Sequence, residues 1–284
     1  MSDITDSTRL AYSGGVASPR QLALRARRLG WLRYAEHYLR TMRAFWVPLL
    51  LQSVGTPLLY LVAMGVGLGT LVDRSHSSPM GVPYLTFVAP AVMVATVMGA
   101  AATEAMYPVM SGFKWQRLYY GAAASPLSPG QIAMGHLLGA CARFVIQAVV
   151  FWIFLIAFGA ARSPWSPLTV PIAVLGALAF GAPLQAYSAT LRDEGTSFNF
   201  VARFILTPMT LFAGTFFPLT AMPVYLRWIG WVSPMWHATQ LARRASFAMP
   251  EPSWLTATHL VYLVGLVAVG VVLSRRVYTR RLGE

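Results

Sequence analysis

The stretch "FAGTFFPLTAMPVYLRWIGWVSPMWHATQLARR", residues 212–244, decides how often this chain crosses a membrane. It is apolar enough to resemble a membrane span, yet it contains Pro218, Pro223, Pro234 and, near its middle, Arg227. Each proline removes a backbone donor and interrupts a helix. An arginine at the bilayer centre costs roughly 2.5–3.5 kcal/mol on insertion scales. We therefore do not interpret the stretch as a spanning helix.

The composition places the whole chain in a membrane. Of its 284 residues, 56% are hydrophobic and only 11% are charged, whereas soluble domains carry about a quarter charged residues. The mean hydropathy is +0.56. The first thirty residues are polar and Arg-rich, so no cleavable signal peptide is expected. Cys141, the one cysteine, lies in an apolar run and cannot form an intrachain disulfide; we expect it to pack as a small hydrophobe.

Six apolar segments have the length of about 20 residues that a helix needs to cross the hydrocarbon core. They are residues 45–69, 83–107, 131–158, 168–190, 198–217 and 255–273. The predicted fold class is therefore an all-α polytopic membrane protein, with a tail at 1–44 and a six-helix transmembrane domain at 45–284.

The basic residues predict the orientation of these spans. With the N-terminus in the cytoplasm, 15 of the 22 lysines and arginines flank the spans on the cytoplasmic side. Because basic residues are retained on that side, we expect both termini to be cytoplasmic and the protein to be a multi-pass protein of the inner (plasma) membrane. The net charge of +13 is then a matter of topology and membrane lipids, and no nucleic-acid partner is expected.

This orientation puts residues 218–250 outside the cytoplasm. We expect two short helices there, near 221–231 and 235–248, joined at Ser233–Pro234. They either re-enter the outer leaflet or lie on its surface, because broken backbone within the bilayer must be covered by protein or water.

The segment before the first span shows two faces at helical spacing. One face is apolar, with Leu32, Ala35, Leu39, Met42 and Trp46, and another carries Arg33, His37, Arg40 and Arg43. We expect an amphipathic helix at the inner membrane surface. The alternative is an ordinary basic flank that enforces topology.

An ordered series of motifs between residues 187 and 244 resembles ABC type-2 exporter permeases, above all the nodulation lipooligosaccharide and daunorubicin-resistance group. The motifs that carry the resemblance are Phe198–Phe200, Pro208, Ala213–Pro218, Pro223, Ser233–His237, and Arg243 or Arg244. The segment "ASPLSPGQIAMGHLLGA" (124–140) resembles the opening of the family's third span. The departures are mild: Ala213 is often Ser in the family, and Met235 is often Leu.

The resemblance implies six helices, an interfacial helix first, and a re-entrant helical pair that here includes Pro218, Pro223, Pro234 and His237. It also implies a dimer of permeases, either copies or paralogues, working with two separate ATPase subunits. Residues 1–284 contain no G-x-x-x-x-G-K-[ST] motif, so ATP and Mg²⁺ would be bound by the partner and no cofactor by this chain. The cargo implied is amphipathic: a drug, a lipid or a glycolipid.

The predicted cytoplasmic loop 108–130 contains the sequence "FKWQRLYY" (113–120), which mixes aromatic and basic residues. In the family this position holds the helix that couples the permease to its ATPase. The expected coupling residues are Phe113, Lys114, Trp115, Gln116, Arg117 and Leu118. The alternative is a short interfacial turn without a partner.

Charged residues within spans are functional candidates by default. Glu104 and Arg203 lie at similar depth from the cytoplasmic ends of their spans and are expected to pair. Arg143 lies deeper, and we expect it to contact Gln185 or Tyr187. Such pairs either fix helix packing or contact cargo.

The remaining carboxylates and histidines give little indication of a catalytic or metal site. Asp193 and Glu194 occupy a short turn and are expected to be solvated. His136, His237 and His259 are not expected to form a close ligand set, so no metal site is predicted. The leading function is therefore an ATP-driven export permease. A membrane-embedded enzyme and an ATP-independent transporter are the alternatives.

Overall fold

The computed structural model describes residues 19–42, 44, 46–74, 79–193 and 195–283, and among these every regular element is helical. The helices are α2 (Pro19–Met42), α3 (Trp46–Val62), α4 (Thr70–Arg74), α5 (Tyr84–Met110), α6 (Leu118–Ala123), α7 (Pro129–Ala157), α8 (Thr169–Thr190), α9 (Gly195–Phe200), α10 (Thr207–Phe212), α11 (Val224–Val232), α12 (Pro234–Phe247) and α13 (Ser253–Leu282). Residues 1–18, Arg43, Glu194 and the side chain of Trp46, which appear in the sequence analysis, lie outside the described part.

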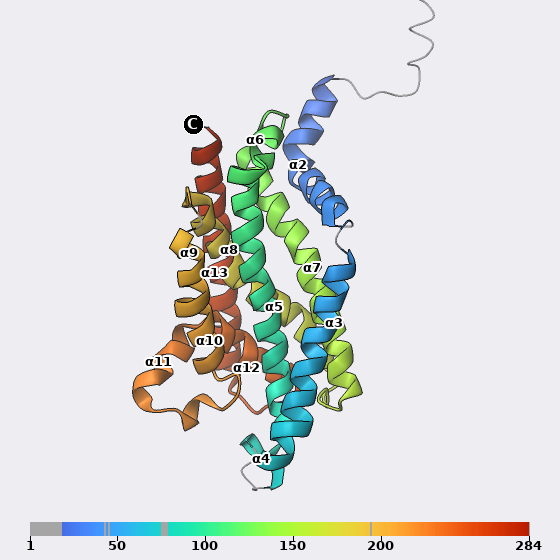
Figure 1. Cartoon of the computed structure of the whole chain (residues 1–284), viewed down its shortest axis with the longest axis vertical. Helices are drawn as coiled ribbons and strands as arrows, with labels where there is room; N and C mark the ends of the chain where they lie inside the picture. Colours follow the sequence, from blue (N-terminus) through green and yellow to red (C-terminus); the bar gives the residue numbers. More distant parts are fainter. Residues whose placement is uncertain (1–18, 43, 45, 75–78, 194, 284) are drawn as a thin grey trace, which may run out of the picture.

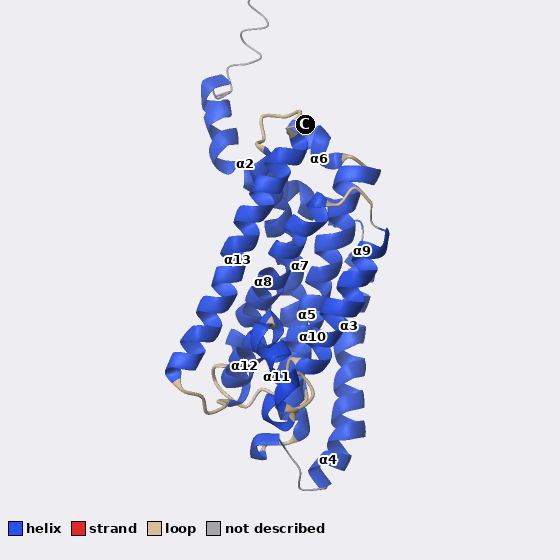
Figure 2. Ribbon diagram, turned by 90° about the vertical axis from the view of Figure 1, so that its left-hand side faces the viewer, coloured by secondary structure: helices blue, strands red, loops and turns tan. Residues whose placement is uncertain are grey.

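Five helical stretches of the described chain are long and apolar enough to cross a membrane. They are Ser53–Arg74, Tyr84–Trp115, Pro129–Ala157, Ser166–Thr190 and Ser253–Leu282. Their axes run roughly parallel along the long dimension of the molecule (Figures 1 and 2). The chain is thus an all-helical polytopic membrane protein.

The predicted span 198–217 has no counterpart among these five. Helix α9, a π-helical segment at Val201–Leu206 and α10 cover residues 195–212. The chain then turns at Gly214, whose φ of +76° is a left-handed conformation that glycine adopts without a side-chain clash. This turn ends the helix at Phe212, before the predicted boundary.

The predicted loop 108–130 is largely helical, which corrects the sequence interpretation. Pro108 lies inside α5, and the helix continues as a π-helical turn, Ser111–Trp115. Arg117 then takes a left-handed φ of +53° and α6 begins at Leu118. The bend between these two helical segments therefore occupies only Gln116 and Arg117.

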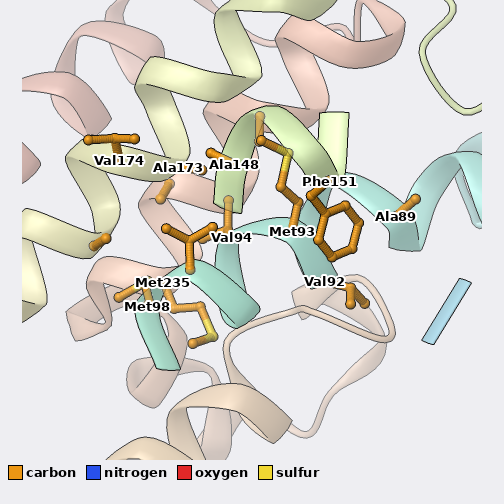
Figure 3. Close-up of a cluster of buried hydrophobic side chains, with 14 of the residues drawn as sticks. Ala89, Val92, Met93, Val94, Met98, Ala148, Phe151, Ala173, Val174 and Met235 are labelled. Carbon is orange, nitrogen blue, oxygen red and sulfur yellow. The ribbon is translucent and has the colours of Figure 1, made fainter. Parts of the chain in front are cut away.

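Helices α5 and α8 form the centre of the bundle. The core of buried side chains includes Met93 and Met98 from α5, Phe151 from α7 and Met235 from α12 (Figure 3). Phe87 of α5 belongs to the same core. The other members are mostly alanines and valines. Small side chains let the helices approach closely, which is how helices associate within a membrane.

Helix α2 packs along α7. Tyr34 and Ala35 are buried, whereas Leu32 and Leu39 are exposed. The contact is close because α7 presents Gly135 and Gly139 to α2; a Cβ on Gly135 would lie 2.6 Å from the backbone oxygen of Trp31. The close approach therefore depends on the two glycines of α7, while Leu32 and Leu39 of the predicted apolar face stay on the outside of the bundle.

Candidate functional site

Most of the residues predicted to couple with an ATPase are exposed at the tip of the turn, residues 114–118, whereas Phe113 is buried at its base, here called the root of the turn. They lie at the end of the bundle that carries α6 and the C-terminus, here called the α6 end (Figure 1). Trp115 and Leu118 flank the bend and are 50% and 48% exposed, and Lys114, Gln116 and Arg117 are exposed beside them. Phe113 is buried.

The root of the turn is an aromatic cluster that sequence reasoning did not find. The ring of Phe113 lies 4.7 Å from that of Tyr119 and 4.8 Å from that of Tyr278, measured between centroids. Tyr278 comes from α13, far along the chain. Edge-to-face aromatic contacts such as these add about 0.5–1.5 kcal/mol each beyond area burial. The cluster therefore fixes the turn to the last helix.

Arg281, also on α13, holds the same root from the other side. Its guanidinium lies 4.2 Å from the centre of the Phe113 ring. Its Nη1 donates to the carbonyl oxygens of Ala189 (2.6 Å) and Leu191 (2.8 Å), at the C-terminus of α8. A cation is favoured at a helix C-terminus, where the carbonyls have no helical partners. The basic C-terminus, interpreted from sequence as a topology signal, thus also has a structural role.

A surface ion pair joins the turn to the α8–α9 connection. Lys114 Nζ lies 2.5 Å from Asp193 Oδ1. This contact holds the pKa of the Asp193 carboxyl below its usual value. Asp193 is exposed, as expected of a solvated turn, but it has a specific partner.

The predicted Glu104–Arg203 pair is wrong. Glu104 Oε2 lies 2.5 Å from Arg143 Nη1, and their side chains are 5% and 17% exposed. Arg203 is exposed on the π-helical segment. The predicted partners of Arg143 are also wrong: Gln185 donates to the carbonyl of Ala133 instead, and Tyr187 is exposed. Depth along a span identified charged residues near the same level of the membrane. It could not show which side of each helix faces which neighbour, and the pairing depends on that.

The carboxylate of Glu104 has a second polar partner besides Arg143. Tyr38 of α2 donates a hydrogen bond from its hydroxyl to Glu104 Oε1. Its ring also meets the edge of His136, with centroids 4.8 Å apart, and His136 Nδ1 lies 3.0 Å from the Tyr119 hydroxyl. Helices α2, α5 and α7 are therefore tied together by one buried polar network.

This network lines a cavity of about 400 Å³ at the α6 end. Glu104, Arg143 and His136 are among the charged and polar residues that line it, and Tyr107 and Trp115 are among the aromatic ones. Aromatic surface with a few convergent polar groups is typical of pockets that bind small molecules or headgroups. Because Trp115 belongs both to the cavity and to the exposed turn, movement of the turn would change the cavity.

The three prolines of the 218–234 segment occupy helix starts. Pro218 precedes a single 3₁₀ turn, Pro223 precedes α11, and Pro234 is the first residue of α12. At these positions the missing backbone donor costs nothing. Ser233 caps α12 by accepting a hydrogen bond from the Met235 backbone N–H at 3.1 Å. The segment thus contains the expected pair of short helices, α11 and α12.

Two arginines stabilise this end of the bundle, here called the α11 end. Arg243 is fully buried; its guanidinium stacks 3.6 Å from the centre of the Phe87 ring and donates to the carbonyls of Phe87 and Gly214. Arg227 donates to the carbonyls of Thr220 and Met222. The arginine of the predicted motif is therefore a structural anchor between α12, α5 and the Gly214 turn.

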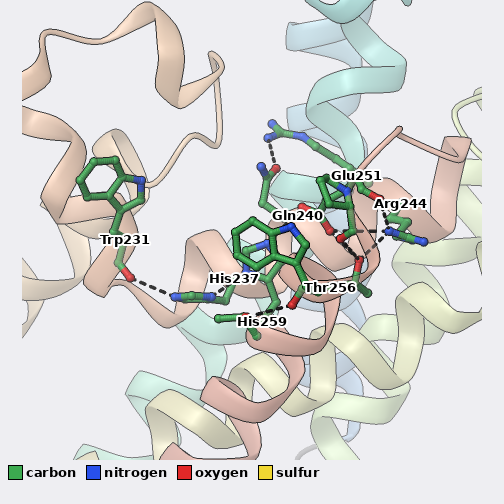
Figure 4. A network of polar contacts seen from close by, with 11 residues as sticks. Trp231, His237, Gln240, Arg244, Glu251, Thr256 and His259 are labelled. Carbon is green, nitrogen blue, oxygen red and sulfur yellow. Dashed lines mark hydrogen bonds and ion pairs between the residues drawn. The ribbon is translucent and has the colours of Figure 1, made fainter.

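Two of the three histidines lie in contact with each other. His237 of α12 and His259 of α13 face each other with their Nδ1 atoms 2.7 Å apart (Figure 4). His259 Nε2 lies 3.1 Å from Glu251 Oε1, and His237 Nε2 lies 2.9 Å from the Trp231 carbonyl. His136 belongs to the other network. Among the described residues, no group of three or more His, Cys, Asp and Glu side chains is arranged to hold a metal ion.

Comparisons with known proteins place these features in a family context. The ABC-2 type transporter family matches residues 34–247. The chain is 26% identical to nodulation protein J of Rhizobium leguminosarum bv. viciae over 257 residues, which is 89% of this chain and 95% of that protein. It is 29% identical to the inner membrane transport permease YadH of Escherichia coli K12 over 209 residues, 71% of this chain and 76% of YadH. The matched range includes α5 to α12 and therefore both polar networks, apart from His259 and Glu251.

Proposed function

Because this chain belongs to the ABC-2 type transporter family, we propose that it is the permease subunit of an exporter whose ATP is hydrolysed by a separate subunit. One observation carries the proposal. At the α6 end a short turn presents Trp115 and Leu118 to the outside while its root is fixed to α8 and α13. An exposed apolar tip on a rigid root is suited to receive a partner and transmit its movement.

The proposed ATPase contact uses Trp115 and Leu118 as apolar anchors and Arg117 as a charge at the rim. Aromatic anchors dominate the energy of protein interfaces, and truncating one can cost 2 kcal/mol or more. A rim charge chiefly affects the association rate and its salt dependence. ATP and Mg²⁺ would bind to the partner subunit, because residues 1–284 show no P-loop motif.

We place the α6 end in the cytoplasm of a cell whose inner membrane holds the protein. The support is the distribution of basic residues: Arg275, Arg276 and Arg280 of α13, and Lys114 and Arg117 at the turn, all lie at this end. Anionic lipid headgroups would meet α2 and these arginines. The α11–α12 pair then lies on the outer side, at or within the outer leaflet.

The proposed cargo is amphipathic and enters at the cavity beneath α2. Its walls offer aromatic surface for an apolar group, and Glu104, Arg143 and His136 offer polar contacts for a headgroup. A drug, a lipid or a glycolipid satisfies these requirements equally.

A second permease, identical or paralogous, would complete the transport path. Helix α5 is mostly buried, yet Thr103 is exposed on it and lines a groove of about 250 Å³ together with Tyr60 and Gln147. Polar groups facing such a groove are more readily accommodated against another chain or a cargo than against lipid tails.

The test is reconstitution of the chain in liposomes together with a candidate P-loop ATPase subunit from the same organism. We expect ATP-dependent movement of a fluorescent amphipathic cargo and hydrolysis that cargo stimulates. The control is the same ATPase with its P-loop lysine replaced. Transport that persists without a functional ATPase would instead favour an ATP-independent transporter, and failure of the two proteins to associate would refute the proposal.

A further inference from the structure

The contacts of His237, His259 and Glu251 fix how many protons the three side chains hold together. His237 Nε2 faces the Trp231 carbonyl oxygen; a carbonyl only accepts, so this nitrogen carries a proton. Two facing Nδ1 atoms form a hydrogen bond only if one of them is protonated. The contact between His259 Nε2 and the Glu251 carboxyl also needs one proton, on either partner.

The three contacts therefore require three protons. Two neutral imidazoles and one carboxylate supply only two. The additional proton is shared by the network: it resides on the carboxyl or on one of the two rings, and every arrangement that satisfies all three contacts places a proton between the two Nδ1 atoms.

The surroundings support retention of this proton. The side chains of His259 and Glu251 are 0% and 4% exposed, so the Glu251 carboxyl is little solvated by water and depends on its polar neighbours. Burial, opposed in part by the Trp231 carbonyl, lowers the pKa of His237 to about 4, which disfavours the additional proton on that ring.

The remaining groups that face the network are one cation, one hydroxyl and two aromatic rings. Arg244 Nη1 lies 4.0 Å from Glu251 Oε2 but bonds more closely, at 2.6 Å, to the Thr256 hydroxyl, which donates to the same carboxyl oxygen. Tyr262 stacks on His237 with centroids 4.0 Å apart, and Trp236 meets both imidazoles at its edge. Arg244 is thus too far away to replace the shared proton.

The spacing of the rings fits a proton better than a metal ion. A zinc ion bound about 2.0–2.1 Å from each nitrogen at a tetrahedral angle would hold the two Nδ1 atoms about 3.3 Å apart. The separation of 2.7 Å is that of a hydrogen bond.

We propose that His237, His259 and Glu251 form a buried proton-binding site that fastens the α11–α12 pair to the start of α13. The three groups come from separate elements: His237 from α12, His259 from α13 and Glu251 from the connection between them, with the Trp231 carbonyl at the end of α11. Loss of the proton breaks one of the three contacts and so loosens the attachment of the α11–α12 pair to the start of α13. The proton belongs to the network as a whole, so both rings titrate together.

The test uses the full chain, labelled with ¹⁵N-histidine and treated with EDTA, in lipid bilayers. Solid-state NMR across the pH range in which the protein stays folded reports which ring nitrogens are protonated. The two rings are assigned by a cross-peak between their Nδ1 atoms, so assignment needs no variant. We expect a protonated Nδ1 in this pair at neutral pH, and loss of one proton with a common midpoint for both rings as pH rises.

Glu251→Gln is the decisive variant. Its amide N–H donates to His259 Nε2 without an added proton, so His259 keeps Nδ1–H and the pair should show no titration at high pH. The thermal midpoint should fall with rising pH in the wild type and stay constant in Glu251→Gln. The matched control is Glu36→Gln, which removes an exposed carboxylate paired with Arg40 and should titrate as the wild type does.

Three results would overturn the proposal. The first is a wild-type spectrum in which neither Nδ1 is protonated at any pH. The second is a Glu251→Gln protein whose rings titrate as in the wild type. The third is a wild-type spectrum that depends on whether EDTA was added, which would assign the pair to a metal ion. If Glu251→Gln fails to fold, the wild-type spectrum still decides.

Discussion

Removing one partner of the Glu104–Arg143 pair should destabilise the protein strongly. Glu104→Gln keeps the side-chain shape but leaves the guanidinium without its counter-charge in a mostly dry site, since the two side chains are 5% and 17% exposed. Breaking a fully buried pair costs about 3–5 kcal/mol. Because Arg143 retains some exposure, we expect the lower end, about 3 kcal/mol, which corresponds to a fall in Tm of roughly 6–12 °C.

A double-mutant cycle, measured by thermal unfolding in one detergent, identifies which arginine pairs with Glu104. Glu104→Gln combined with Arg143→Met should recover much of the loss, giving a coupling energy of about 1–3 kcal/mol. The matched control is Arg203→Met, which removes the exposed arginine that sequence depth had suggested. Its effect should add to that of Glu104→Gln within about 0.5 kcal/mol. If the losses of stability caused by Glu104→Gln and Arg143→Met simply add, the pairing is refuted, and with it the common network of α2, α5 and α7.

Three further predictions concern the α6 end. Gly135→Ala introduces a Cβ 2.6 Å from a backbone oxygen of α2, so α2 should detach from α7 at a cost of about 1–3 kcal/mol; protease sensitivity of α2 reports it. Arg281→Ala should loosen the root of the turn and increase hydrogen exchange at residues 111–118, whereas Arg280→Ala, in the same last turn of α13, should not. The pKa of Asp193 is lowered, so its contact with Lys114 is fully present above the usual carboxyl range and is lost as pH falls through the lowered pKa. Hydrogen exchange of the native turn should therefore rise only in acid. In the double variant with cysteines at 114 and 193, a disulfide crosslink replaces the ion pair, and the turn should show no such acid dependence.

The sequence predicted the parts of the fold that depend on periodic apolarity and on proline. Long apolar segments and the positions of Pro218, Pro223 and Pro234 were sufficient to anticipate helices α11 and α12 between the last two membrane-embedded segments. The end of α10 was missed because a single left-handed residue, Gly214, terminates the helix inside an apolar run. Apolarity carries no information on such a turn.

The candidate site was only partly predictable for a related reason. The sequence singled out Glu104 and Arg143, but the pairing depends on how α5 and α7 are rotated about their axes. Arg281 joins α13 to the end of α8, far away in the sequence. The contact between His237 and His259 joins two consecutive helices, but their local sequence does not show that the two rings face each other. The available signals were weak: an arginine in the last turn of a helix, and a histidine after Ser-Pro.

The proposal that Trp115 and Leu118 seat an ATPase is tested most directly by truncating both and measuring co-purification with the ATPase together with cargo-stimulated hydrolysis in liposomes. The chain offers a matched control in Trp165 and Leu168, which have the same residue types and spacing, are 66% and 48% exposed, and precede α8 at the opposite end of the bundle. Trp115→Ala with Leu118→Ala should remain folded but lose about thirtyfold or more in affinity for the ATPase, leaving hydrolysis that cargo no longer stimulates. Trp165→Ala with Leu168→Ala should retain both. Full co-purification and full stimulation in the first double variant would contradict the account and move the coupling surface elsewhere.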